Sequence, residues 1–166
     1  MAWVGSVPRV QTQDPRAARA DALALDLGRI VIRAVWVDEV CADLAVEYQR
    51  AAGQVDRAKV TGESGKPLGA ALRAAGAVEW AEEYDALYLR RNDVIHGLWS
   101  ADVHHRQMVR PTRGGNNAGA FMVKTWDAGW LELLARDLDD FFDRARVELF
   151  SRRGILDWLT PARPYD

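Results

Sequence analysis

The chain has 166 residues, of which 49% are hydrophobic and 28% are charged, and its formal net charge at pH 7 is -2. This length and composition indicate one soluble globular domain with a substantial buried core. The small negative charge excludes a chain that is basic over its whole surface, as a coat for nucleic acid would be.

The composition also bears on the compartment. The chain has no run of eighteen apolar residues, and its N-terminus lacks the charged and then apolar pattern of a secretion signal. Cys41 is the only cysteine, so no intramolecular disulfide can form, and a reducing compartment fits best. We therefore expect a cytoplasmic protein with no membrane contact.

The first long helix is predicted over residues 17–52, after an extended N-terminal arm over residues 1–15. Apolar residues recur there in alternating steps of four and three, and Gly53 closes the pattern. Four further apolar residues widen the stripe, which predicts burial on more than one side. The stripe consists of Leu23, Leu27, Ile30, Ala34, Val37, Cys41, Leu44 and Tyr48, and the four additions are Val31, Val35, Trp36 and Val40.

Two further helices follow a polar loop over residues 53–65. Residues 61–66 invite comparison with a phosphate-binding loop, but the required spacing of glycine and lysine is absent. Pro67 instead suits the first turn of a short helix that ends before Gly76. The next helix is predicted from about Val78 to Trp99.

The end of the chain combines strand and helix signals. Strand-like runs over residues 106–110 and 121–125 flank Pro111 and a Gly-Gly-Asn-Asn stretch, which predicts a β-hairpin over about residues 104–125. A last long helix is predicted over residues 126–151, with Gly154 ending it. The expected fold is an all-α bundle, one domain over residues 16–159, with this small hairpin before the last long helix and a tail over residues 160–166.

Residues 91–97, Arg-Asn-Asp-Val-Ile-His-Gly, interrupt the apolar pattern of the third helix. Apolar residues define one face of that helix, and the same spacing places Arg91 on it. A buried guanidinium keeps its charge and requires an anionic or hydrogen-bonding partner. Asn92 and His96 lie four positions apart on a neighbouring flank and form a polar notch beside the core. The apolar face consists of Trp80, Tyr84, Leu87, Val94 and Leu98.

This segment resembles the R-x4-6-H motif of the HEPN superfamily, the higher eukaryotes and prokaryotes nucleotide-binding domain. Arg91, Asn92 and His96 match the motif position by position, and Arg90 gives a second spacing within its range. The resemblance implies an up-and-down helical bundle. It also implies a metal-independent endoribonuclease whose site forms where two protomers bring their motif helices together, although some members only bind or scaffold.

Metal-independent RNA cleavage requires a base for the ribose 2′-hydroxyl, an acid for the departing 5′-oxygen and positive charge beside the phosphorane. His96 suits the acid or base, because imidazole titrates near roughly pH 6.5. Arg91 can grip two phosphate oxygens, and Asn92 can orient the imidazole. Asp93 is expected to position an arginine. One such histidine per chain can fill only one of the acid and base roles. A homodimer formed through the motif helix would supply a second His96 for the other role.

Further contacts with RNA are expected from residues that follow or flank the motif. Between residues 90 and 124, basic residues outnumber acidic residues. This segment is either a local basic surface or an ordinary solvated loop. The Trp99 ring could stack on a nucleobase of the RNA, or pack in the core or at the dimer interface. The candidate substrate-binding residues are Arg90, Asp93, Trp99, Arg106 and Arg110. The remaining basic residues of the segment are Arg91, Arg113 and Lys124.

Other interpretations of the motif remain open. Arg91 can pair with a carboxylate of the first or last helix. The His96 imidazolium at the C-terminal end of its helix would contribute about 0.3 to 1 kcal/mol of stability. Neither interaction needs a ligand. The chain would then be a non-catalytic module that binds nucleic acid or a partner protein. A third possibility is a toxin or defence effector that an antitoxin or a nucleotidyltransferase neutralises, although Trp99 stands where some such toxins carry tyrosine. No metal or other cofactor is expected, because His104 and His105 are adjacent and no chelating motif occurs.

Overall fold

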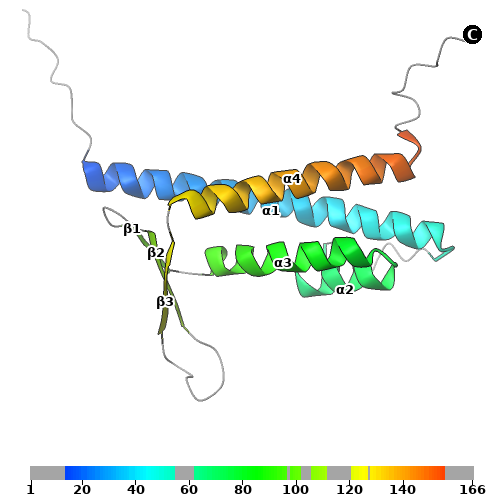
Figure 1. Ribbon diagram of the computed structural model, residues 1–166, viewed down its shortest axis with the longest axis horizontal. Coiled ribbons are helices and arrows are strands. Elements are labelled where there is room, and N and C mark those ends of the chain that lie inside the picture. The colour runs from blue at the N-terminus through cyan, green and yellow to red at the C-terminus, as the bar shows by residue number, and fades with distance from the viewer. Residues whose placement is uncertain are drawn as a thin grey trace, which may run out of the picture.

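A computed structural model describes residues 14–54, 62–96, 98–101, 106–111, 121–126 and 128–155. Its helices are α1 (Pro15–Ala51), α2 (Lys66–Ala74), α3 (Val78–Ile95) and α4 (Ala128–Arg152). The two long helices, α1 and α4, run side by side, and α2 and α3 pack against one flank of that pair (Figure 1). The prediction of a helical bundle is confirmed.

Local signals set the boundaries of the helices. The Asp14 carboxylate accepts a hydrogen bond of 2.9 Å from the backbone N–H of Arg16, and Pro15 occupies the first turn. The assignment of Pro15 to the N-terminal arm is therefore wrong, while the rest of that arm, residues 1–13, lies outside the described residues. Gly53, Gly76 and Gly154 follow α1, α2 and α4 with positive φ, as their predicted role as helix stops requires.

The third helix is shorter than the sequence predicts. It ends at Ile95, and Leu98–Ala101 forms strand β1 instead of continuing the helix to Trp99. Leu98 keeps the apolar spacing of α3, but Gly97 precedes it in the chain and glycine is a poor helix former. Pairing with β2 satisfies the backbone groups of residues 98–101 that face that strand, and outweighs the helical pattern.

Three strands form an antiparallel sheet in the order β1-β2-β3, with β2 at Arg106–Pro111 and β3 at Phe121–Trp126. Leu98 is opposite Val109, and Arg106 is opposite Trp126. Strands β2 and β3 cover the two segments for which the sequence predicts strands, and the predicted hairpin tip lies outside the described residues. Figure 1 shows the sheet at the end of the bundle where α3 ends and α4 begins.

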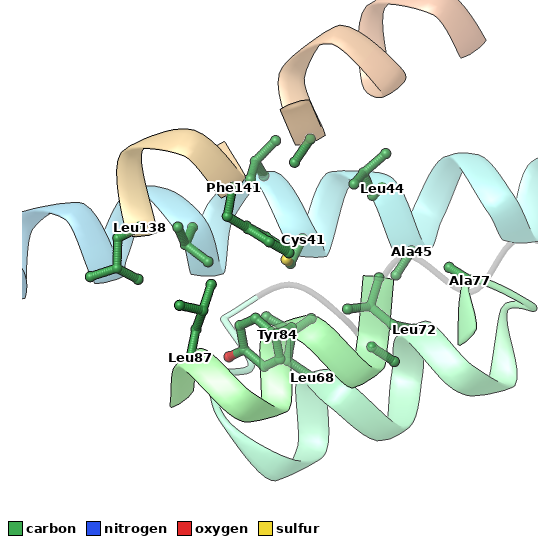
Figure 2. Packing of buried hydrophobic residues seen from close by; sticks show 14 of the residues in the cluster. Cys41, Leu44, Ala45, Leu68, Leu72, Ala77, Tyr84, Leu87, Leu138 and Phe141 are labelled. Atoms are coloured by element: carbon green, nitrogen blue, oxygen red, sulfur yellow. The ribbon is translucent and has the colours of Figure 1, made fainter. Parts of the chain in front are cut away.

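The hydrophobic core lies where the four helices meet. Figure 2 shows Tyr84 of α3 between Leu68 of α2 and Leu87, with Cys41 of α1 and Phe141 of α4 nearby. Cys41 is fully buried, as predicted, and burial raises the pKa of its thiol well above the ordinary value. A buried neutral thiol acts as a small apolar side chain and is a poor nucleophile.

The outward side of α1 departs from the prediction of burial on more than one side. Val40 is buried, but Val31, Val35 and Trp36 are 41%, 46% and 46% exposed. Helix α4 packs along one flank of α1, and α2 and α3 pack along another, so no described element covers these three side chains. Trp36 instead lines an open groove of about 720 Å³ with Phe142 and other residues of α1 and α4.

Candidate functional site

The three motif residues lie in the last turns of α3, with different exposure. The Arg91 side chain is 19% exposed, Asn92 is half-buried and His96 is exposed. His96 is the residue that ends the helix, and its backbone N–H donates to the carbonyl oxygen of Asn92 at 3.1 Å. The imidazole is therefore open to a ligand or a partner, while the guanidinium faces the interior.

The Arg91 guanidinium faces Asp38 of α1 and the ring of Tyr88. One Arg91 terminal nitrogen lies 3.9 Å from Asp38 Oδ2, and the guanidinium carbon lies 5.6 Å from the centre of the Tyr88 ring. These contacts are an ion pair without hydrogen-bond geometry and a cation–π contact. The sequence places Arg91 on the core-facing side of α3, and this placement is observed.

The Asp38 carboxylate belongs to a chain of short hydrogen bonds. The hydroxyl of Tyr84 donates to Asp38 Oδ1 at 2.6 Å, and the backbone N–H of Gly65 donates to the Tyr84 oxygen at 2.6 Å. Burial raises the pKa of Asp38, although the hydrogen bond from Tyr84 and the charge of Arg91 oppose the shift. Burial and Asp38 together raise the pKa of Tyr84, so its hydroxyl stays a donor at neutral pH.

Two adjacent motif residues carry buried polar atoms without a hydrogen-bond partner. These atoms are Nε of Arg91 and Oδ1 of Asn92, and the described residues hold one other such side-chain atom, Nε of Arg19. A buried donor or acceptor left without a partner costs about 1 to 3 kcal/mol. In folded proteins a bound water, an ion or a ligand satisfies such atoms, so two successive positions of this kind make this part of α3 a candidate binding site.

Arg90 lies on the other side of α3 and does not join Arg91. Its guanidinium forms an ion pair of 2.6 Å with Asp137 of α4 and lies 5.8 Å from the ring of Trp130. Asp93 is half-buried. The two arginines that fit the motif spacing are thus distinguished by their surroundings, because Arg90 is hydrogen-bonded to its carboxylate and Arg91 is not.

The remaining predicted contacts lie on the sheet. Trp99 is in β1 opposite Met108, and Arg110 and Arg106 are in β2 opposite Met122 and Trp126. The described side chains do not include those of the strands, so the predicted stacking and phosphate contacts stay predictions. His104, His105 and Arg113 lie outside the described residues.

Sequence reasoning missed three residues of this site: Asp38, Tyr88 and the hydroxyl of Tyr84. Tyr84 is buried in the core as predicted, but its hydroxyl holds the carboxylate that faces Arg91. The detectable signal was an acid on the flank of a strongly apolar helix. A carboxylate of the first or last helix was expected as one possible partner of Arg91, and Asp38 of α1 occupies that place.

Among the described side chains, no group of three or more His, Cys, Asp or Glu residues is arranged to hold a metal ion. None of the described helices has the length and apolar character needed to cross a bilayer. Comparisons of the chain with protein-family models, with curated proteins and with solved structures found no match. The physical properties of the site are therefore the basis for a functional assignment.

Proposed function

We propose that this protein is a metal-independent endoribonuclease of the HEPN type, acting in the cytoplasm as a homodimer. One observation carries the proposal: Arg91 and Asn92, adjacent in the motif, hold buried polar atoms without partners, one turn before an exposed histidine at the end of the same helix. An anion with several acceptor oxygens, such as a phosphodiester, would bind the exposed edge of the guanidinium and neutralise its charge.

The reaction assigns a separate role to each motif residue. His96 takes the proton from the ribose 2′-hydroxyl or gives one to the departing 5′-oxygen. Arg91 neutralises the charge that develops on the phosphorane, and Asn92 orients the imidazole or contacts the phosphate. The 2′-oxygen bonds to phosphorus as the bond from phosphorus to the 5′-oxygen breaks, so the products carry 2′,3′-cyclic phosphate and 5′-hydroxyl ends.

A second protomer belongs to the proposal because one His96 fills one proton-transfer role at a time. Two motif helices related by a two-fold axis bring a second His96 to the same phosphodiester. Such an enzyme would damage the RNA of its own cell, which favours a toxin or defence effector. An antitoxin or a nucleotidyltransferase is the kind of partner that would restrain it.

The test is the cleavage of end-labelled single-stranded RNA in EDTA, with analysis of the product ends. The wild-type protein is expected to leave 2′,3′-cyclic phosphate, and His96→Ala is expected to be slower by about a hundredfold or more. Arg91→Lys keeps a charge but loses the two-pronged grip, so it should retain more activity than Arg91→Ala. Arg29→Ala, which removes a 55% exposed arginine of α1, is the matched control. Equal cleavage by His96→Ala and wild type would remove the proposal.

A second candidate function is a non-catalytic module that binds nucleic acid or a partner protein. The observation in its favour is that both motif arginines face carboxylates, Asp38 and Asp137, which neutralise charge that a nuclease would direct at phosphate. RNA that stays intact in the cleavage assay but binds with an affinity that falls steeply as salt rises would favour this module.

A further inference from the structure

Arg91 and four other residues at the junction of α1, α2 and α3 form one cluster, which we call the Arg91 cradle. They are Asp38, Gly65, Tyr84, Tyr88 and Arg91. Ring centres of Tyr84 and Tyr88 lie 6.3 Å apart in a stacked arrangement, and Arg91 lies over the Tyr88 ring. The residues come from three separate segments of the chain, α1, the start of α2 and α3, so the fold itself assembles the cradle.

We propose that Asp38, Tyr84 and Tyr88 are positioning residues, which hold the Arg91 guanidinium in a fixed orientation so that its exposed edge meets a phosphodiester. This inference rests on the proposed function and adds to it three residues outside the motif. It assigns them an effect on the rate of the chemical step through Arg91, without contact with RNA.

The contacts of the cradle constrain Arg91 without using its hydrogen-bond donors. An ion pair at 3.9 Å and a cation–π contact both attract the guanidinium, and neither is a hydrogen bond. Two other arginines of the bundle behave differently. Arg33 donates through Nε to both oxygens of Asp139 at 2.7 Å, and Arg90 donates to Asp137 at 2.6 Å. Their donors serve the fold, whereas Nε of Arg91 has no hydrogen-bond partner.

The position of Asp38 is fixed from behind by Tyr84 and Gly65. The Tyr84 hydroxyl accepts a hydrogen bond from the Gly65 N–H and donates one to Asp38 Oδ1, so two hydrogen bonds fix its position. Gly65 has φ of 65°, and a Cβ atom there would overlap the ring of Tyr88. Only glycine therefore lets the chain approach Tyr88 closely while its N–H reaches Tyr84.

The space around the guanidinium defines the direction from which an anion arrives. The small pocket that Arg91 lines with Asp38, Tyr84 and Tyr88 has a volume of about 10 Å³. This volume is about that of a single water probe, so a phosphate cannot enter it. The anion must therefore reach Arg91 through the 19% of its side chain that is exposed, while the buried Nε stays out of its reach.

The first test measures the cleavage kinetics of substitutions that each remove one contact of the cradle. Asp38→Asn and Tyr88→Leu are expected to lower kcat by about tenfold or more, because a misplaced group slows the chemical step, while KM changes less than about threefold. Tyr84→Phe, which releases Asp38 Oδ1, is expected to act in the same direction. Tyr88→Phe keeps the aromatic face and, as the conservative variant, is expected to retain most of the kcat that Tyr88→Leu loses. A lower KM with unchanged kcat in Asp38→Asn would mean that Asp38 merely repels the substrate, and would overturn the inference.

The second test does not depend on cleavage, so it separates this inference from the proposed function. The Nε–Hε signal of Arg91 in a nitrogen–proton NMR spectrum is assigned by its loss in Arg91→Lys, and its order parameter is measured. The order parameter is expected to be high in the wild type and in Tyr88→Phe, and lower in Asp38→Asn and Tyr88→Leu. If RNA is not cut but this pattern holds, the cradle stands and the nuclease assignment fails. An order parameter unchanged by Asp38→Asn and Tyr88→Leu overturns the cradle.

Discussion

At the scale of single residues, the negative charge of Asp38 costs the fold stability at neutral pH. Its raised pKa means that the folded chain holds a proton on this carboxyl more tightly than the unfolded chain does. The tighter binding of this proton by the folded chain stabilises the fold. This stabilisation is complete below the ordinary pKa of 3.8 and is lost as pH rises through the raised pKa of the folded state. A carboxylate with a raised pKa beside a half-buried arginine is a candidate member of a functional site.

Asp38→Asn is therefore expected to unfold at the same temperature as the wild type at pH 7, or up to a few degrees higher. The neutral side chain avoids the burial of a charge, and its oxygen still accepts the hydrogen bond from Tyr84. The difference should shrink towards acid pH, where Asp38 itself is neutral. Thermal unfolding at both pH values measures this. A loss of several degrees at pH 7 would mean that the ion pair with Arg91 is a net source of stability.

At the scale of helices and strands, the features that depend on local sequence were predicted and those that depend on distant partners were not. Proline, glycine and apolar spacing located α1, α2 and α4 to within two residues at each end. The end of α3 was misplaced because Leu98 continues the helical pattern while β2 pairs with it. Likewise, Arg91 was placed on the core side of α3, but its partner Asp38 depends on how α1 and α3 meet.

Helix α4 offers a direct test of which face is buried. Leu138 is 2% exposed and packs in the core, whereas Leu133 on the same helix is 42% exposed. Leu138→Ala is expected to lower the free energy of unfolding by about 2 to 5 kcal/mol, because it removes buried methyl groups and leaves a cavity. Leu133→Ala should change it by roughly 0.5 kcal/mol or less. Urea denaturation measures the free energy of unfolding of both variants. Similar decreases in the two variants would show that the buried face of α4 is assigned incorrectly.

At the scale of the whole molecule, the question is whether two chains form one site. His96 lies exposed at the end of α3, next to the sheet that joins α3 to α4 (Figure 1). If each phosphodiester needs His96 from both protomers, a dimer with one altered chain is inactive. If each chain acts alone, the altered chain leaves its partner unaffected.

The most direct measurement is the RNA cleavage rate of dimers assembled from equal amounts of wild-type and His96→Ala chains by co-expression. Random pairing makes about one quarter of the dimers fully wild type, so the proposed shared site predicts about one quarter of the wild-type activity per total protein. A light-scattering mass measurement on the same sample establishes that the protein is dimeric. Activity of about one half, or a monomer that cuts RNA at the full rate, would contradict the shared site.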